Sequence, residues 1–209
     1  PPPPAHPRFR SWSAAGHLTG SRGFRMRDSI PDSLIIIAGK GVYPLELAVS
    51  ARHQGVKRLA VIAFRGETER SIERLVDQVA WIHLGQLGAM LEAMKSFAIP
   101  AAVMAGQITP TALFRVRPDK AMFDLLARLE VRNAETIFGA AAEALGRIGV
   151  TLQPAHLFME KSMPEPGLLT PVAPTEAQQA DIELGLRVAK VPSSIEVGQT
   201  VVLKAGTIL

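Results

Sequence analysis

The stretch LIIIAGKGVYP, residues 34–44, decides the fold that we predict for this chain. Its apolar run indicates a buried strand, its Gly-Lys-Gly sequence indicates a turn, and the residues that follow are typical of a helix start. The stretch AAVMAGQ, residues 101–107, repeats the strand and the glycine. Glycine has no Cβ, so the backbone can approach a ligand closely, and a helix N-terminus offers unpaired N–H groups with a partial positive charge. Two such strand ends on one sheet predict a site for an anion or a nucleotide.

Strand-like and helix-like segments alternate along most of the chain. This alternation is typical of βαβ units, in which helices cover both faces of a parallel sheet. We therefore predict an α/β fold with a Rossmann-like N-terminal domain, whose ligands would lie beyond the carboxyl ends of the strands. The predicted strands are 34–38, 58–64, 79–83, 101–105 and 150–153, and the predicted helices are 43–54, 69–76, 86–97, 120–130, 134–148 and 175–190.

Composition narrows the class of protein. Hydrophobic residues make up 47% of the 209 residues, which is enough for a substantial core. The absence of cysteine excludes disulfides, thiolate nucleophiles and cysteine-bound metals. The formal charge of +4 lies in residues 1–30, where five arginines accompany one aspartate, and residues 31–209 are balanced. A neutral body argues against nucleic acid as a partner. No apolar run approaches the roughly 20 residues that span a bilayer.

We expect three segments. Residues 1–31 are rich in Pro, Ser, Gly and Arg and predict a disordered leader, which upstream sequence joined to a start at Met26 explains better than a transit peptide does. Residues 32–160 would form the Rossmann-like domain. Residues 161–209 would begin a second, α+β domain, whose end is typical of a strand, a turn and the start of another strand. Because a single hairpin cannot bury its own apolar face, we expect the chain to stop inside this domain.

The Gly-Lys-Gly turn departs from the dinucleotide-binding fingerprint. Pro44 stands at the position of the third glycine, and Arg65 follows the second strand in place of an acidic residue. An NAD(P)-dependent oxidoreductase is one alternative function, and a nucleotide-sugar-binding module without catalysis is another. The five histidines have no metal-ligand spacing, and no G-x-S-x-G sequence is present. We expect His156 to be partly buried, and Asp181 and Glu183 to lie on a solvated surface.

Six short motifs along the chain form a recognisable series. They are IAGKG at 37–41 with Pro44, RGET at 65–68, GQLG at 85–88, AGQ at 105–107, ADIE at 180–183 and VGQ at 197–199. In this order and spacing they resemble the LpxI family, the UDP-2,3-diacylglucosamine pyrophosphatases of lipid A biosynthesis. The resemblance covers roughly residues 33–209 and rests on the six motifs together, since no single motif carries it.

The resemblance implies hydrolysis of UDP-2,3-diacylglucosamine to 2,3-diacylglucosamine 1-phosphate (lipid X) and UMP, with Mg²⁺ as cofactor. It also implies a cytoplasmic location with peripheral contact with the inner membrane. No catalytic residue is expected within this chain, because the family's catalytic aspartate would lie beyond Leu209, and the chain alone would then be inactive. By motif position, the substrate-binding residues would be Gly41, Gly106, Gln107, Leu152 and, from the C-terminal domain, Thr200.

Two positions depart from the family pattern. Lys40 stands where the family commonly has Asn or Gly, and its charge is either a contact for a diphosphate or simply exposed. Ala134 and Glu135 replace an aspartate pair of the family, so we predict no role there. The metal ligands and the oligomeric state stay open at this point.

Overall fold

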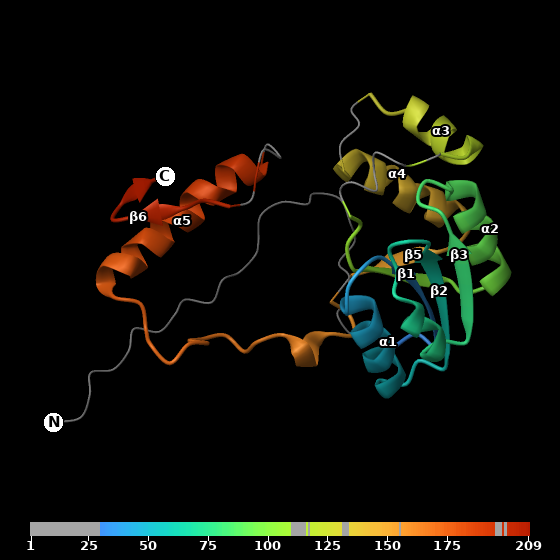
Figure 1. Cartoon of the computed structure of the whole chain (residues 1–209), viewed down its shortest axis with the longest axis horizontal. Helices are drawn as coiled ribbons and strands as arrows, with labels where there is room; N and C mark the ends of the chain where they lie inside the picture. The colour runs from blue at the N-terminus through green and yellow to red at the C-terminus, as the bar shows by residue number, and fades with distance from the viewer. Residues whose placement is uncertain are drawn as a thin grey trace. The chain divides into compact units, whose positions relative to one another are not determined.

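The computed structural model describes residues 30–109, 116, 118–130, 134–154, 156–194, 198 and 200–209. Within them, five strands form one parallel sheet in the order β3-β2-β1-β4-β5 (Figure 1). Each predicted strand is present, with its ends within one residue of the expected bounds, and the α/β fold is confirmed. The strands are β1 (Ser33–Ala38), β2 (Arg58–Phe64), β3 (Gln78–Ile82), β4 (Ala101–Ala105) and β5 (Thr151–Gln153).

β1 is the centre of the sheet because it is almost wholly apolar and is paired along both edges. Ile36 pairs with Val61 of β2 on one side and with Val103 of β4 on the other, and all three side chains are completely buried. The chain runs from β1 outward to β3 and then returns to the far side of β1. The carboxyl ends of β1 and β4 therefore form the point at which strand order reverses, where ligands of such sheets bind.

Helices cover both faces of the sheet (Figure 1). One face carries α1 (Tyr43–His53) and the 3₁₀ helix η1 (Arg70–Arg74), and the other carries α2 (Leu87–Phe97) and α4 (Ala134–Arg147), with α3 (Lys120–Ala127) packed against α2. Alternate strand residues point to the second face and meet the apolar side of α2. The buried residues of this core include Ile35, Ile37, Ile62, Ile82, Met90, Met94, Phe97 and Leu145.

η1 differs from the α-helix that the sequence predicts over 69–76. It is a 3₁₀ helix of five residues, from Arg70 to Arg74, and its buried residue is Ile72. One buried side chain is too little apolar surface to stabilise two full α-helical turns. The indole N–H of Trp81 donates to Glu73 Oε1 at 2.6 Å, which fastens this short helix to β3.

The described residues fall into two compact units, divided between Phe158 and Met159, where the sequence predicts a boundary after residue 160. The second unit contains η3 (Glu160–Ser162), α5 (Glu176–Ser194) and an antiparallel hairpin of β6 (Leu203–Lys204) and β7 (Thr207–Ile208). The carboxylate of Asp181 in α5 accepts hydrogen bonds from the N–H groups of Ala205 and Gly206, at 2.9 and 2.7 Å. Asp181 thus ties the hairpin turn to the helix through hydrogen bonds that are themselves exposed, a structural role that the sequence does not predict.

Two further expectations concern single segments. His156 is exposed, not partly buried as predicted, and it lies in a turn after β5 in which Phe158 and Met159 are the buried residues. The predicted leader lies outside the described residues except for its last two positions. Among the described residues, no helix is both long enough and apolar enough to cross a membrane.

Candidate functional site

The carboxyl ends of β1 and β4 come together as predicted, but they bind each other. The N–H of Gly39 donates to the carbonyl oxygen of Ala105 at 2.8 Å. Lys40 and Gln107 then form an isolated antiparallel bridge, with Lys40 N donating to Gln107 O at 2.6 Å and Gln107 N donating to Lys40 O at 3.1 Å. These two backbone N–H groups are thus already paired across the switch point.

Two glycines make this close approach possible. A Cβ on Gly39 would lie 2.4 Å from the carbonyl oxygen of Gln107. A Cβ on Gly106, which has a φ of +89°, would lie 2.7 Å from the carbonyl oxygen of Lys40. Both glycines therefore bring one loop backbone against the other. Gly106 is exposed, and its contact with substrate stays a prediction.

The start of α1 offers an anion less than we predict from the sequence. Pro44 has no N–H group. The N–H groups of Leu45 and Glu46 both donate to the carbonyl oxygen of Val42, at 3.0 and 3.1 Å. Few of the unpaired donors that make a helix N-terminus attractive to phosphate therefore remain at this helix.

The five predicted substrate-binding residues occupy three places. Gly41 has a φ of +97°, and a Cβ added to it would meet no atom of the described residues within 4 Å. It lies next to the Lys40–Gln107 bridge, with Gly106 and the exposed Gln107. Leu152 lies within β5, where it pairs with Ala102 and packs on the hydrophobic core. Thr200 is exposed in the second unit. The sheet edge therefore brings together three of the five residues.

The end of β3 is filled by the chain itself. A Cβ on the buried Gly85 would lie 2.2 Å from a side-chain carbon of Val116. Asp119 Oδ2 accepts a hydrogen bond from the N–H of Gly88 at 2.7 Å, in the first turn of α2, while Asp119 Oδ1 accepts one from the N–H of Met122 in α3 at 2.9 Å. A carboxylate thus already occupies the anion position at this helix start.

An open pocket of about 390 Å³ remains at the carboxyl ends of β1, β2 and β3. Ligand pockets of small molecules begin at about this size. Its lining carries three cationic side chains, two carboxylates and one indole. The lining residues are Lys40, Arg65, Gly66, Glu67, Thr68, Glu69, Arg70 and Trp81.

The wall of this pocket is held by a buried hydroxyl. Thr68 is 8% exposed, and its Oγ1 accepts a hydrogen bond from the N–H of Phe64 at 2.8 Å while donating to the carbonyl oxygen of Ala38. The N–H groups of Glu67 and Thr68 both donate to the carbonyl oxygen of Phe64. The loop after β2 is therefore fixed to the ends of both β1 and β2.

Glu67 connects the same loop to the segment after β4. Its Oε2 accepts hydrogen bonds from both the N–H and the hydroxyl of Thr109, each at 2.8 Å. The carboxylate that is closest in sequence to Arg65 is thus committed to Thr109. Among the described residues, Lys40, Arg65 and Arg70 make no ion pair with a carboxylate.

Sequence reasoning finds part of this pocket. It singles out Lys40 and the RGET motif that begins at Arg65, but it misses Arg70 and Trp81. Arg70 follows Arg65 by five positions on a segment predicted to be an ordinary helix, and Trp81 lies in a predicted strand. Only the pairing of β2 with both β1 and β3 brings these residues to one place.

The predicted Mg²⁺ has no ready-made cage. In the described part of the chain, no group of three His, Asp or Glu side chains is placed to hold a metal ion. Mg²⁺ in proteins is held mainly by carboxylates and substrate phosphates. Mg²⁺ therefore stays a prediction of the family resemblance, and we derive no step through the metal.

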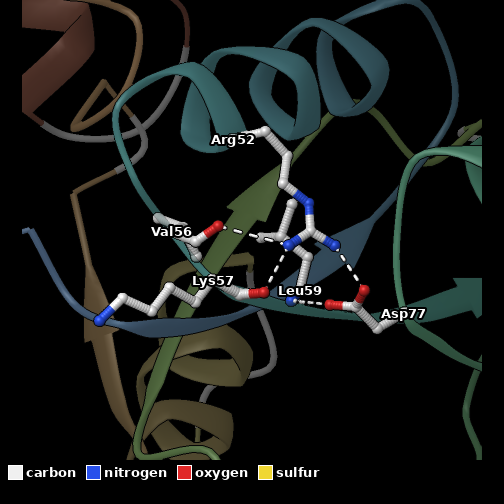
Figure 2. Close-up of polar contacts among 5 residues, drawn as sticks. All are labelled: Arg52, Val56, Lys57, Leu59 and Asp77. Carbon is white, nitrogen blue, oxygen red and sulfur yellow. Dashed lines mark hydrogen bonds and ion pairs between the residues drawn. The ribbon is translucent and has the colours of Figure 1, made fainter.

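The opposite, amino-terminal edge of the sheet carries a structural cluster. Figure 2 shows Arg52 at the end of α1 reaching Asp77, with 2.7 Å between Nη2 and Oδ1, and donating to the carbonyl oxygens of Val56 and Lys57. Asp77 Oδ2 accepts from the N–H of Leu59 at 2.7 Å. The hydrogen bond from Arg52, followed by the one from Leu59, lowers the pKa of Asp77 below its ordinary value. This cluster fastens α1 to β2 and β3, away from the pocket.

Known proteins match most of this chain. The LpxI protein of Caulobacter vibrioides, described as a UDP-2,3-diacylglucosamine pyrophosphatase, is 26% identical over 178 residues. The matched region covers 83% of this chain and 62% of that protein, so the chain spans less than two thirds of this relative's length. The family model of the LpxI N-terminal domain matches residues 33–162. The chain therefore belongs to the LpxI family, and its five-stranded unit is the family's N-terminal domain.

Proposed function

We propose that this chain is the substrate-binding part of a pyrophosphatase of lipid A biosynthesis. The substrate would be UDP-2,3-diacylglucosamine, and the reaction would be attack of water on its diphosphate to give 2,3-diacylglucosamine 1-phosphate and UMP. Membership of the LpxI family and the printed activity of the Caulobacter relative support this choice.

One observation carries the proposal at the level of the structure. The switch point of the sheet, with Gly41 and Gln107, adjoins an open pocket whose three cationic side chains have no carboxylate partner in the described part of the chain. A diphosphate ester carries negative charge that such a pocket neutralises, and neutralisation lowers the cost of building further charge on the leaving phosphate. The chain's own contribution to the reaction would be to hold and orient the diphosphate.

Ligand-dependent stability tests the proposal. A ligand that binds only the folded chain raises the melting temperature as its concentration passes Kd. UDP and UDP-2,3-diacylglucosamine in detergent micelles should both raise it, with the lipid substrate acting at lower concentration. A second assay tests turnover. It measures UMP release from UDP-2,3-diacylglucosamine by the protein expressed from the whole reading frame that encodes this chain.

NADPH is the competing ligand in the same assay. Arg65 follows β2, where an arginine of NADP-dependent enzymes contacts the 2′-phosphate. However, the bridge between Lys40 and Gln107 closes the place where a pyrophosphate would approach the first turn of such an enzyme. A melting-temperature rise with NADPH and none with UDP would replace the pyrophosphatase by an oxidoreductase.

A further inference from the structure

We propose that Lys40, Arg65 and Arg70 form an anion subsite that holds the phosphate groups of a nucleoside diphosphate. The inference rests on the proposed function, and it places the diphosphate on the β2 side of the sheet edge. The crevice between β1 and β4, where sequence reasoning expects it, is occupied by backbone.

The backbone N–H groups at the ends of the other strands already have partners and are not free to bind a phosphate. The ends of β1 and β4 use their N–H groups on each other, through Gly39, Lys40 and Gln107. The end of β3 is capped by Asp119, whose carboxylate already accepts from the first turn of α2. The pocket that Arg65 and Arg70 line lies mainly along the loop after β2, and neither the Lys40–Gln107 bridge nor Asp119 fills it.

The cationic side chains of the pocket differ from other cations of this unit in having no ion pair among the described residues. Lys57, Lys95 and Lys120, in the same unit, each have a carboxylate oxygen within 3.0 Å. The three pocket cations have none among the residues that the structure describes, although two glutamates line the same pocket. Like charges that converge without partners repel one another and attract an anion. Arginine guanidinium groups in addition match phosphate oxygens with two parallel N–H donors.

The backbone that carries the pocket cations is held in place before any ligand binds. The backbone at Lys40 and at Arg65 is fixed by contacts that involve no cationic side chain. Lys40 is held by its bridge to Gln107, and Arg65 N donates to Ile82 O at 2.8 Å. The loop between Arg65 and Arg70 is held by the buried Thr68 hydroxyl and by the bonds from Thr109 to Glu67. A ligand therefore finds the backbone of the subsite in place, which keeps the cost of ordering low.

Affinity measurements on single variants test this subsite. The probes are UDP, inorganic pyrophosphate and uridine, measured by calorimetry on the whole chain at two salt concentrations. R65A and R70A should each weaken both UDP and pyrophosphate by about tenfold or more, because each removes charge-assisted hydrogen bonds. Uridine, which has no phosphate, should be unaffected by either substitution. R65K should keep part of the affinity, since a point charge without the planar fork remains.

A matched control comes from the same 3₁₀ helix. Arg74 is exposed and does not line the pocket, so R74A removes an equal charge at the other end of η1. It should leave the affinity for UDP within about twofold of the unchanged chain, because an exposed charge outside the pocket donates no hydrogen bond to the anion and is screened by salt. Equal losses in R70A and R74A would overturn the subsite, because they would reflect net charge alone.

Trp81 supplies a local readout. The chain has two tryptophans, and Trp12 lies outside the described residues, so W12F leaves the pocket indole as the only reporter. Pyrophosphate should change the emission of Trp81 in W12F, and the change should disappear in W12F with R65A. Emission that responds to pyrophosphate equally in both proteins would contradict a role for Arg65.

The outcomes separate this inference from the proposed function. If R65A and R70A bind UDP as tightly as the unchanged chain, the subsite is wrong while UDP recognition stands. If pyrophosphate binds and both substitutions weaken it, but NADPH displaces it and UDP-2,3-diacylglucosamine does not, the subsite stands and the proposed substrate is wrong.

Discussion

At the scale of single residues, the buried polar contacts of this chain serve as fasteners between neighbouring strand ends. Thr68 is nearly buried and links β1 to β2 through the carbonyl of Ala38 and the N–H of Phe64. At the other edge, Arg52 and Asp77 link α1 to the loop before β3. The contribution of the Thr68 hydroxyl should not depend on pH, whereas that of the Asp77 carboxylate should, so the two can be measured separately.

Replacing Thr68 by valine should lower the free energy of unfolding by about 1–3 kcal/mol, because buried backbone partners lose their hydrogen bonds. The measurement is urea denaturation followed by circular dichroism. T68S keeps the hydroxyl and should lose much less. Equal losses in both variants would mean that packing of the methyl group, and not the hydrogen bonds, holds this loop.

Asp77 should make the stability depend on pH. Its pKa is lowered in the folded chain by the bond from Arg52, so the ionised carboxylate stabilises the fold above its ordinary pKa of about 3.9, and the contribution fades as pH falls through the lowered value. D77N should cost about 1 kcal/mol at neutral pH, since the carboxylate is 49% exposed and partly screened.

Unfolding of D77N and the unchanged chain is compared at pH 7 and at about pH 3. The difference between them should shrink at the lower pH. D32N is the control. Asp32 pairs with Lys57 and is more exposed than Asp77, so D32N should change stability little at either pH. A D77N difference that is as large at the acidic pH would contradict a role for the charge.

At the scale of elements, the strands could be predicted from the sequence more closely than the contacts of the loops that follow them. Runs of buried apolar residues determine β1, β2 and β4, and their bounds could be predicted within one residue. The type of η1 could not, because one buried side chain gives no usable periodicity. The sequence also shows a glycine at the end of β1 and of β4, but it does not show which backbone each glycine faces. That Gly39 faces the backbone of Gln107 depends on the register between β1 and β4.

The same limit applies to the candidate site. Arg65 could be placed at a strand end from the sequence, but its meeting with Lys40 and Arg70 depends on β1 and β2 being neighbours. The role of Asp181 escaped sequence reasoning for a similar reason, because its partners in the hairpin are 24 and 25 residues away. Contacts between distant segments carry no local pattern.

Glycine substitutions test the packing of the two strand ends. G39A should lower the free energy of unfolding by about 2–3 kcal/mol, because its methyl group would lie 2.4 Å from the Gln107 carbonyl oxygen. G41A meets no neighbouring atom of the described residues and should cost only the strain of a positive φ, about 1 kcal/mol. G139A, in the exposed middle of α4, should stabilise by up to about 1 kcal/mol. A G39A loss no larger than that of G41A would refute the close approach of the two loops.

At the scale of the whole molecule, the first compact unit contains everything that its sheet needs. The five strands, both helix layers and the buried core lie between residues 33 and 158. Its end is secured by Phe158, whose side chain is completely buried and whose carbonyl oxygen accepts from Ser50 Oγ and from Gln54 Nε2. The pocket with the three cations belongs to this unit alone.

Shortening the chain tests that independence. A chain that ends at Ser162 should unfold in one cooperative transition, with a melting temperature within about 3 °C of the transition of this unit in the longer chain. A chain that ends at Gln153 loses Phe158 and should melt clearly lower. Equal melting of the two shortened chains would show that Phe158 does not complete the core.

The diphosphate of the substrate should bind at the carboxyl edge of the sheet, beside Lys40, Arg65 and Arg70. The most direct test is an NMR titration of the isotope-labelled chain with UDP. We expect saturable shifts of the side-chain signals of Arg65 and Arg70 and of the Trp81 indole N–H, with the Arg52 signal at the opposite edge unchanged. Shifts confined to the region of Arg52, or no shifts at saturating UDP, would contradict this placement of the diphosphate.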